Sequence, residues 1–441
     1  MTKIKIFGWL LLLAACMPLA TNQGPVTQPS SSRATTQLPT SPTPSAKVFS
    51  SPHRTLPTVF PESVALPSAI STPMPRPLET PFSERGITIT PLAGNGMRGN
   101  QDGAALEAQF NGVGQVCQDS KGNLYILDRF AVRLLSTDGR ISSLAGTGES
   151  GFKDDIGVQA QFGSLMACAV DQDDFVYVLD LNNGRIRKIT AHGIVSTWSG
   201  SGRSDLVDGP PEKASLFRAY GMVLDRRKQE FFVLDAYGLR RVSLSTGNVL
   251  TLYNATVRAK NLHAGSNNTL IDGSLQDVAL LGSPSNTLLL GIDSLSSKIY
   301  IYDSENYAVR ILSENNVTTL AGGATHQAYR DDIALNARFN SVSQITFDSE
   351  RNVLYILDNL PEHQFIRVLE PSGLVRTLLL PGQTQERNLF FRQIGSIFIQ
   401  DKNHLLVSAL PRSTSQSNEN EVPRLYMVTL PDTLPLISRR E

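Results

Sequence analysis

A short apolar strand that ends in aspartate recurs five times along this chain. The copies end at Asp128, Asp180, Asp235, Asp303 and Asp358, so that successive copies are 52, 55, 68 and 55 residues apart. A sixth, degenerate copy at 405–409 lacks the aspartate. Self-similarity at a roughly constant period of this size is typical of propellers and solenoids, in which a repeat buries its apolar face only against its neighbours.

Each copy of the strand has the same neighbours. A strand that ends at or near an aspartate precedes it, a strand that carries arginine follows it, and a fourth apolar strand closes the first five units. Tight polar turns such as 120–123 separate the strands. Short strands rich in Val, Ile, Leu and Tyr between Gly, Asp and Asn turns predict antiparallel, four-stranded units.

The fourth strand of the last unit is missing from its expected place. Six inner strand triplets are present, but only five closing strands follow them, and the last triplet ends at 424–430. The segment 87–92, which precedes the first unit, has the pattern of the missing strand. We therefore predict an all-β domain over 84–441, a six-bladed propeller that the N-terminal strand 87–92 closes, because closure removes open sheet edges.

The repeats resemble those of the NHL family. The segment 180–189, DLNNGRIRKI, is similar to the core of an NHL repeat. The segments 92–96 with 109–112, and 144–148 with 161–162, are similar to the linkers of bacterial members. The resemblance covers about 87–430 and is weak in the fourth and sixth repeats. It implies four-stranded blades around a central channel.

The start of the chain resembles a bacterial lipoprotein signal. A basic stretch precedes an apolar run at 6–15, which is too short to span a bilayer as a helix. The run ends in LAAC, similar to a lipobox, so that 1–15 is the expected signal peptide and Cys16 the lipidated N-terminus. A plain cleaved signal and an uncleaved anchor are the alternatives. Met17 in the following position leaves both the cell membrane and an outer membrane open as destinations.

Residues 16–83 are expected to form a lipid-anchored, disordered linker. Pro, Ser and Thr dominate the segment, and its apolar residues follow neither a helix nor a strand period. Such a segment cannot bury enough apolar surface to offset its ordering entropy. The whole chain has 40 basic and 40 acidic residues, a balance that provides no positive field for nucleic acid. We therefore expect an exported monomer that contacts the membrane through its lipid and does not bind nucleic acid.

Two further cysteines lie within the repeats. Cys117 and Cys168 occupy matching strands of neighbouring repeats but differ by one alignment position. Adjacent strand positions face opposite sides of a sheet. We therefore expect two buried thiols rather than a disulfide, although an exported protein meets an oxidising compartment.

The segments between repeats carry aspartates at a matching place. They are Asp102, Asp154, Asp155, Asp208, Asp272, Asp331 and Asp332. A ring of carboxylates could bind calcium, but we favour capping of short helical turns, each followed by a phenylalanine that fills the gap between blades. The strand-end aspartates and the arginines after them are expected to hydrogen-bond within or between blades.

The long segments between repeats share one face of the propeller with the loops between second and third strands. We call this the long-loop face and expect binding there, because long loops on a rigid scaffold carry function. The candidate contact residues are Arg129, Phe130, Asn182, Asn183, Tyr237, Asn306, Tyr307 and Asn359. Aromatic and arginine side chains are enriched among residues that dominate binding energy.

These features favour a binding or scaffold module of the cell envelope, with a protein, a glycan or a small molecule as ligand. The chain has no histidine pair at zinc-site spacing, no Gly-x-Ser-x-Gly motif and no phosphate-binding loop. We therefore assign no catalytic residue, metal or cofactor. Because propellers can assemble sites from one residue per blade, a metal-dependent, lactonase-like hydrolase or lyase with its site at the central channel is the alternative. A purely structural role is a third possibility.

Overall fold

The computed structural model describes residues 82–255, 270–278, 280, 290–323, 326–361, 363–380, 391–411 and 422–437. The chain divides into two units, Met1–Ser68 and Ala69–Glu441, and every described residue lies in the second. The expected signal peptide 1–15, the lipidation site Cys16 and nearly all of the linker 16–83 lie outside the described residues. Among those described, no helix has the length and apolar character needed to cross a membrane.

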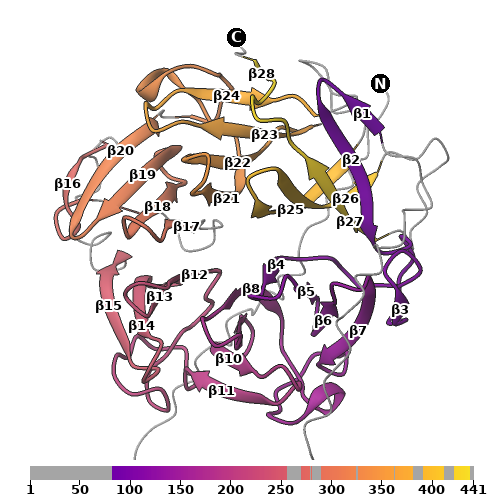
Figure 1. Ribbon diagram of the computed structural model, residues 1–441. Helices are drawn as coiled ribbons and strands as arrows, with labels where there is room; N and C mark the ends of the chain where they lie inside the picture. Colours follow the sequence, from indigo (N-terminus) through magenta and orange to yellow (C-terminus); the bar gives the residue numbers. More distant parts are fainter. Residues whose placement is uncertain are drawn as a thin grey trace, which may run out of the picture. The chain divides into compact units, whose positions relative to one another are not determined.

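The repeats form six antiparallel sheets that are arranged as propeller blades (Figure 1). Blade 1 contains β4 (Val116–Gln118), β5 (Leu124–Asp128), β6 (Ala131–Leu135) and β7 (Arg140–Ala145), with β3 (Gly103–Ala104) at its outer edge. Blade 2 contains β8 (Leu165–Val170), β9 (Val176–Asp180), β10 (Arg185–Ile189) and β11 (Val195–Ser199). Blade 3 contains β12 (Gly221–Asp225), β13 (Glu230–Asp235), β14 (Gly238–Ser243) and β15 (Val249–Asn254).

The second half of the ring has the same design. Blade 4 contains β17 (Leu290–Asp293), β18 (Lys298–Asp303), β19 (Ala308–Ser313) and β20 (Asn316–Gly322), with β16 (Gly273–Ser274) outside. Blade 5 contains β21 (Val342–Asp348), β22 (Val353–Asn359), β23 (Gln364–Leu369) and β24 (Val375–Leu378), with β28 (Leu436–Ile437) outside. Blade 6 contains β25 (Phe391–Asp401), β26 (His404–Pro411), β27 (Arg424–Thr429) and β2 (Ile87–Ala93), with β1 (Phe82–Glu84) outside.

The innermost strands form a closed ring around a central channel (Figure 1). Each of them contacts the innermost strand of both neighbouring blades, in the order β4, β8, β12, β17, β21 and β25, and β25 contacts β4 again. No innermost strand is therefore left with an open side. The predicted fold, a six-bladed propeller of four-stranded antiparallel blades, is confirmed.

Blade 6 joins the two ends of the repeat region. β2 pairs antiparallel with β27, so that Ile89 lies opposite Val428. Ile87 and Ile89 are buried in a cluster between blades 5 and 6. β2 thus has the position that the sequence predicts for 87–92, and it covers the edge that β27 would otherwise expose.

The C-terminal segment continues from blade 6 to blade 5. There β28 pairs with β24, and Arg351 of blade 5 contacts the segment between β27 and β28. The Arg351 guanidinium donates to the carbonyl oxygens of Pro431 at 2.8 Å and Asp432 at 2.9 Å, and to that of Lys402 at 2.8 Å. One side chain therefore links blades 5 and 6 with the C-terminal segment.

The core lies largely between the blades. The cluster between blades 1 and 2 contains Tyr125 and Leu127 of β5 together with Val176 and Val178 of β9. The expected phenylalanine contacts between blades are mostly present. Phe110, Phe162 and Phe339 are buried, whereas Phe217 is half-buried.

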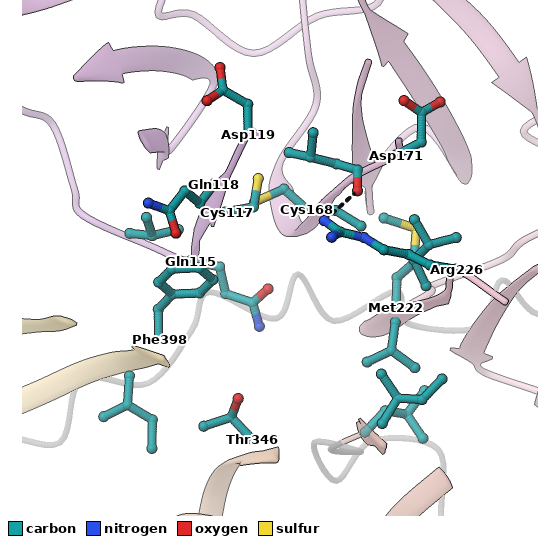
Figure 2. Close-up of a pocket in the computed structure, with 18 of the residues that line it drawn as sticks. Gln115, Cys117, Gln118, Asp119, Cys168, Asp171, Met222, Arg226, Thr346 and Phe398 are labelled. Carbon is teal, nitrogen blue, oxygen red and sulfur yellow. Dashed lines mark hydrogen bonds between the residues drawn. A yellow bond between two sulfur atoms is a disulfide. The ribbon is translucent and has the colours of Figure 1, made fainter. Parts of the chain in front are cut away.

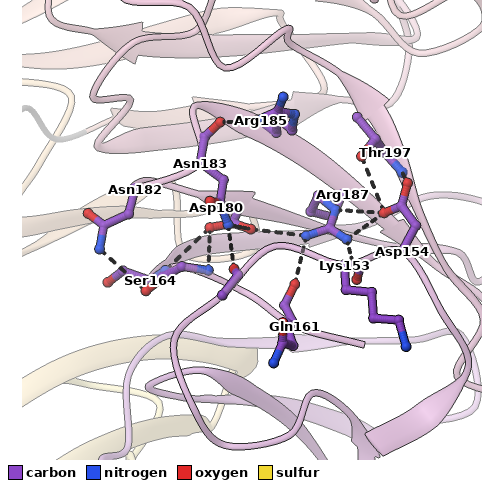
Figure 3. A network of polar contacts seen from close by, with 12 residues as sticks. Lys153, Asp154, Gln161, Ser164, Asp180, Asn182, Asn183, Arg185, Arg187 and Thr197 are labelled. Atoms are coloured by element: carbon purple, nitrogen blue, oxygen red, sulfur yellow. Dashed lines mark hydrogen bonds and ion pairs between the residues drawn. The ribbon is translucent and has the colours of Figure 1, made fainter. Parts of the chain in front are cut away.

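A buried arginine links three parts of each of the first five blades. In blade 2, Arg187 is fully buried and donates from Nη1 to Asp180 Oδ2, at 3.1 Å, and from Nε and Nη2 to Asp154 (Figure 3). Asp154 also accepts from the backbone N–H of Thr197 at 2.9 Å. The other copies are Asp128–Arg133–Asp102, Asp235–Arg240–Asp208, Asp303–Arg310–Asp272 and Asp358–Arg367–Asp331. The strand-end aspartates and the arginines thus bond within blades, one of the two arrangements that the repeats predict.

The aspartates between the repeats were predicted to cap helical turns, and that prediction is wrong. The 3-10 helices η1 (Gly157–Gln159) and η2 (Ala334–Asn336) begin after Ile156 and Ile333, which make no side-chain cap bond. Asp102, Asp154, Asp208, Asp272 and Asp331 instead pair with the buried arginines. Asp155 and Asp332, their neighbours, pair with Lys153 and Arg330. A guanidinium removed from water requires carboxylate partners, which stabilise it far more than a cap would stabilise one helical turn.

Blade 6 replaces this network with apolar groups. Its register places Tyr426 where the other blades have arginine, Pro91 where they have Ser or Thr, and Ala409 where they have the strand-end aspartate. Tyr426 is buried and packs against the Phe391 ring at 5.1 Å between centroids. All the members have changed together, so that no buried charge is left without its partner.

Cys117 and Cys168 form a disulfide, which corrects the expectation of two thiols. Their Cα atoms lie 5.9 Å apart, within the usual range for a disulfide. Cys117 lies opposite Tyr125 and Cys168 opposite Val178, so the one-position offset is real. The prediction treated the two strands as if they shared a sheet. Neighbouring blades pack face to face. Side chains that meet between two blades therefore come from opposite faces of equivalent strands. The offset of one alignment position places Cys117 and Cys168 on those opposite faces, so their sulfurs meet.

Candidate functional site

The central channel contains a cavity of about 410 Å³. All six innermost strands contribute to its lining, so that residues more than 250 positions apart in the chain can contact one ligand. Its volume lies within the range of about 300–1,000 Å³ that is usual for small-molecule sites. The cavity is therefore the strongest candidate site among the described residues.

One part of the cavity wall is apolar. Met222 and Leu224 of β12 and Leu290 and Ile292 of β17 line it, and Phe398 of β25 adds an aromatic ring. Figure 2 shows Phe398 and Met222 on opposite sides of the cavity. A ligand there can bury apolar surface against both sides, which is favourable in proportion to the area removed from water.

The remaining wall carries uncharged polar side chains. The cavity is lined by Gln115 just before β4, Gln118 of β4, Gln172 after β8 and Thr346 of β21. Within the described part of the chain, none of these four side chains makes a hydrogen bond. The Gln115 amide and the Thr346 hydroxyl are directed toward the middle of the cavity (Figure 2). Their hydrogen-bonding capacity is thus open to a ligand.

The two carboxylates of the lining are already engaged. Asp119 accepts from the backbone N–H groups of Lys121 and Asn123, both at 2.9 Å, and from the Tyr125 hydroxyl at 3.1 Å. Asp171 has the same arrangement, with its own turn and with Tyr177 at 3.1 Å. Each aspartate therefore fixes a turn and a tyrosine. Burial raises the pKa of both tyrosine hydroxyls, and the nearby carboxylates raise it further.

Arg226 is the one cation that lines the described cavity. It follows β12, is exposed, and its Nη2 donates to the Val170 carbonyl of β8 at 3.0 Å (Figure 2). The guanidinium thus bridges blades 2 and 3 at the end of the cavity where the short turns lie. The interior beyond it is lined by neutral groups.

The disulfide is part of the wall. Cys117 lies between Val116 and Gln118 on β4 and is bonded to Cys168 on β8. The bond holds β4, which follows Gln115 and carries Gln118, against the next blade. This part of the polar wall is therefore linked covalently to blade 2.

The residues predicted on the long-loop face do not line this cavity. Arg129 is exposed, and its guanidinium lies 4.8 Å from the centre of the half-buried Phe130 ring. Asn182 is exposed, and Tyr307 is half-buried. Tyr237 donates from its hydroxyl to the Ser204 carbonyl. Their role in binding stays a prediction.

All four asparagines among the predicted contact residues donate hydrogen bonds to neighbouring groups. Asn182 donates to the Gly163 carbonyl at 3.3 Å. Asn183 donates to the Gly151 carbonyl and to Asp180, each at 2.8 Å (Figure 3). Asn306 is buried and donates to Asp303 at 2.8 Å. Asn359 donates to the Ser341 carbonyl at 2.8 Å. Asn183 and Asn306 thus belong to the buried arginine networks, and Asn359 fixes the loop beside such a network.

The described residues contain no group of three or more His, Cys, Asp or Glu side chains placed to bind a metal ion. The acidic residues around the ring each have their own partners, as the arginine pairs and the turns of Asp119 and Asp171 show.

Little in the sequence indicates which residues line the cavity. Gln115, Met222, Thr346 and Phe398 lie on, or directly before, the innermost strands of four different blades, but they differ in type and do not repeat. The one sequence feature that these residues share is their position in the repeat. Each lies within four residues before the aspartate at or near the end of its innermost strand.

Comparison with known proteins shows which proteins share the fold but does not identify a family. No family model and no curated protein matches the sequence. An auxiliary nutrient binding protein from Bacteroides ovatus has a similar structure, with a TM-score of 0.55 and 12% identity over 78% of this chain and 77% of that chain. A protein of the same description from Bacteroides thetaiotaomicron has a TM-score of 0.53 and 13% identity over 78% of this chain and 76% of that chain. A putative phosphatase from Bacteroides thetaiotaomicron has a TM-score of 0.52 and 16% identity over 81% of this chain and 80% of that chain. At these identities the likeness shows a shared fold.

Proposed function

We propose that this protein is an envelope binding module that holds a small, neutral molecule in its central cavity. The observation that carries the proposal is the cavity of about 410 Å³, with unengaged amide and hydroxyl groups on one part of its wall and an apolar surface on the other. Small-molecule sites combine mostly apolar walls with a few placed polar groups.

The rigidity of the ring supports binding. The innermost strands close on themselves, and the disulfide and the Arg226 contact fix blades 1, 2 and 3 beside the cavity. A site formed before the ligand arrives avoids much of the ordering cost of association. Two proteins with the same fold are named auxiliary nutrient binding proteins, which agrees with a binding role.

Two features support an extracytoplasmic location. The segment that ends at Cys16 is similar to a lipobox, and Cys117 and Cys168 are paired as a disulfide. Structural disulfides persist mainly in oxidising compartments. The module would then meet its ligand outside the cytoplasm.

Ligand-observed NMR with defined probes tests the proposal. Glucose, cellobiose, leucine, thymidine and octanoate are mixed singly with the full chain, with its Thr346→Trp variant and with its Arg129→Ala variant. We expect at least one probe to bind the wild type and Arg129→Ala, and to lose binding in Thr346→Trp, because the indole occupies the cavity. Binding that survives Thr346→Trp but is lost in Arg129→Ala would place the site on the long-loop face instead.

A further inference from the structure

We infer that the cavity takes a sugar of one or two rings, stacked on Phe398 and hydrogen-bonded by Gln115, Gln118 and Thr346. This inference rests on the proposed function and names its ligand class. Three properties of the cavity carry it: the absence of free charge in its described interior, the kind of polar group it offers, and the arrangement of polar and apolar walls.

The scarcity of unpaired charge in the cavity argues against metabolites that carry a charge. The Asp119 and Asp171 carboxylates accept hydrogen bonds from their own turns and from tyrosines, and Arg226 lies at the short-turn end bonded to Val170. Beyond Arg226, the described interior therefore holds no ion that could pair with a buried carboxylate, phosphate or ammonium. Burying an unpaired charge is costly, so the part of the ligand that lies in this interior is neutral.

The polar groups of the cavity match a ligand whose groups both donate and accept hydrogen bonds. Each glutamine amide offers one acceptor oxygen and two N–H donors, and the Thr346 hydroxyl does both. Neighbouring hydroxyls on a sugar ring have the same dual capacity and fit an amide edge. A hydrocarbon would leave these groups without partners, and an unpaired buried polar group costs about 1–3 kcal/mol.

The walls fit the two-sided chemistry of a pyranose. Such a ring has hydroxyls around its edge and C–H groups on its faces. Phe398 offers a flat aromatic surface to a C–H face, and Met222 and Ile292 border the same space. The amides of Gln115 and Gln118 lie to one side, where a ring edge would point. The volume of about 410 Å³ has room for a sugar of one or two rings.

Titration of the full chain with cellobiose and glucose tests the inference. Gln115→Leu keeps the size of the side chain and removes the amide, and we expect at least a tenfold loss of affinity. Phe398→Leu removes the ring, and we expect a similar loss. The matched control is Gln159→Leu, the same exchange at an exposed position on η1, which should bind as the wild type does. Thermal unfolding shows that each variant is folded.

The outcomes separate the two proposals. Sugar binding that depends on Gln115 and Phe398 but not on Gln159 supports both. If thymidine binds in the cavity and no sugar does, the sugar inference is overturned and the proposed function stands. If only leucine or octanoate binds there, both of which carry charge, the neutral ligand of the proposed function is overturned as well. If no probe binds, both proposals are overturned. Sugar binding unaffected by Gln115→Leu and Phe398→Leu also overturns the inference.

Discussion

Cys117 of β4 and Cys168 of β8 join the innermost strands of two neighbouring blades through a disulfide, although they are 51 positions apart in sequence. The bond restricts the unfolded chain by closing a large loop. Closing a loop of this length is expected to stabilise the fold by about 2–4 kcal/mol. Urea unfolding with and without dithiothreitol measures this. The Cys117→Ala/Cys168→Ala variant should be less stable than the wild type without dithiothreitol, and most of the difference should disappear when dithiothreitol reduces the wild-type bond. An equal effect of dithiothreitol on wild type and variant would contradict the prediction.

The buried arginines should be indispensable as long as their aspartates remain. Arg187 and Asp180 are both fully buried, whereas the Asp154 side chain is 42% exposed. Arg187→Met therefore leaves the Asp180 carboxylate buried without its cation, at an expected cost of about 3–5 kcal/mol. Urea unfolding measures the loss.

The matched double variant tests the reason for that loss. Adding Asp180→Asn to Arg187→Met removes the buried charge, so most of the lost stability should return. Blade 6 supports this expectation, since Tyr426, Ala409 and Pro91 replace the network there without charge. A double variant no more stable than Arg187→Met alone would show that packing, not charge, is responsible.

Two buried tyrosines should respond differently to loss of their hydroxyl. The Tyr177 hydroxyl donates to Asp171 at 3.1 Å, whereas the Tyr302 hydroxyl is buried and has no hydrogen-bond partner among the described residues. Tyr177→Phe should cost about 1 kcal/mol, and Tyr302→Phe should be neutral or slightly stabilising. Chemical unfolding of both variants checks this, and a larger loss for Tyr302→Phe would indicate that its hydroxyl has a partner.

The tyrosines also predict how stability changes at alkaline pH. Burial is the largest cause that raises the pKa of Tyr125 and Tyr177, and it raises the pKa of Tyr329 to about 12. The unfolded chain, with an ordinary tyrosine pKa of about 10, loses these protons first. The contribution of these tyrosines to the free energy of unfolding is therefore fully present below about pH 10. It is lost as pH rises toward the raised pKa values of the folded protein. Free energies of unfolding measured between about pH 8 and pH 11 should fall above about pH 10, and less steeply for Tyr125→Phe/Tyr177→Phe.

The fold could be predicted because its signal repeats. Five strands with the same terminal aspartate fix the period, and the count of closing strands locates 87–92 in blade 6. The cavity could not be predicted in this way. Its contacts depend on how blades pack around the axis, and Gln115, Thr346 and Phe398 share neither residue type nor period. The disulfide was missed for the same reason, because pairing within one sheet does not describe contact between two.

The ring-closing strand should be required for folding although it lies far from the rest of its blade in sequence. β2 pairs with β27 along most of its length, and Ile87 and Ile89 are buried between blades 5 and 6. A chain that begins at residue 94 would expose the β27 edge and this apolar cluster, which favours edge-to-edge aggregation. A chain that begins at residue 82 keeps both strands and is the control. Size-exclusion chromatography and circular dichroism should show a folded monomer for the longer chain and aggregate for the shorter one. A folded, monomeric 94–441 would mean that β2 is dispensable and that blade 6 is stable with three strands.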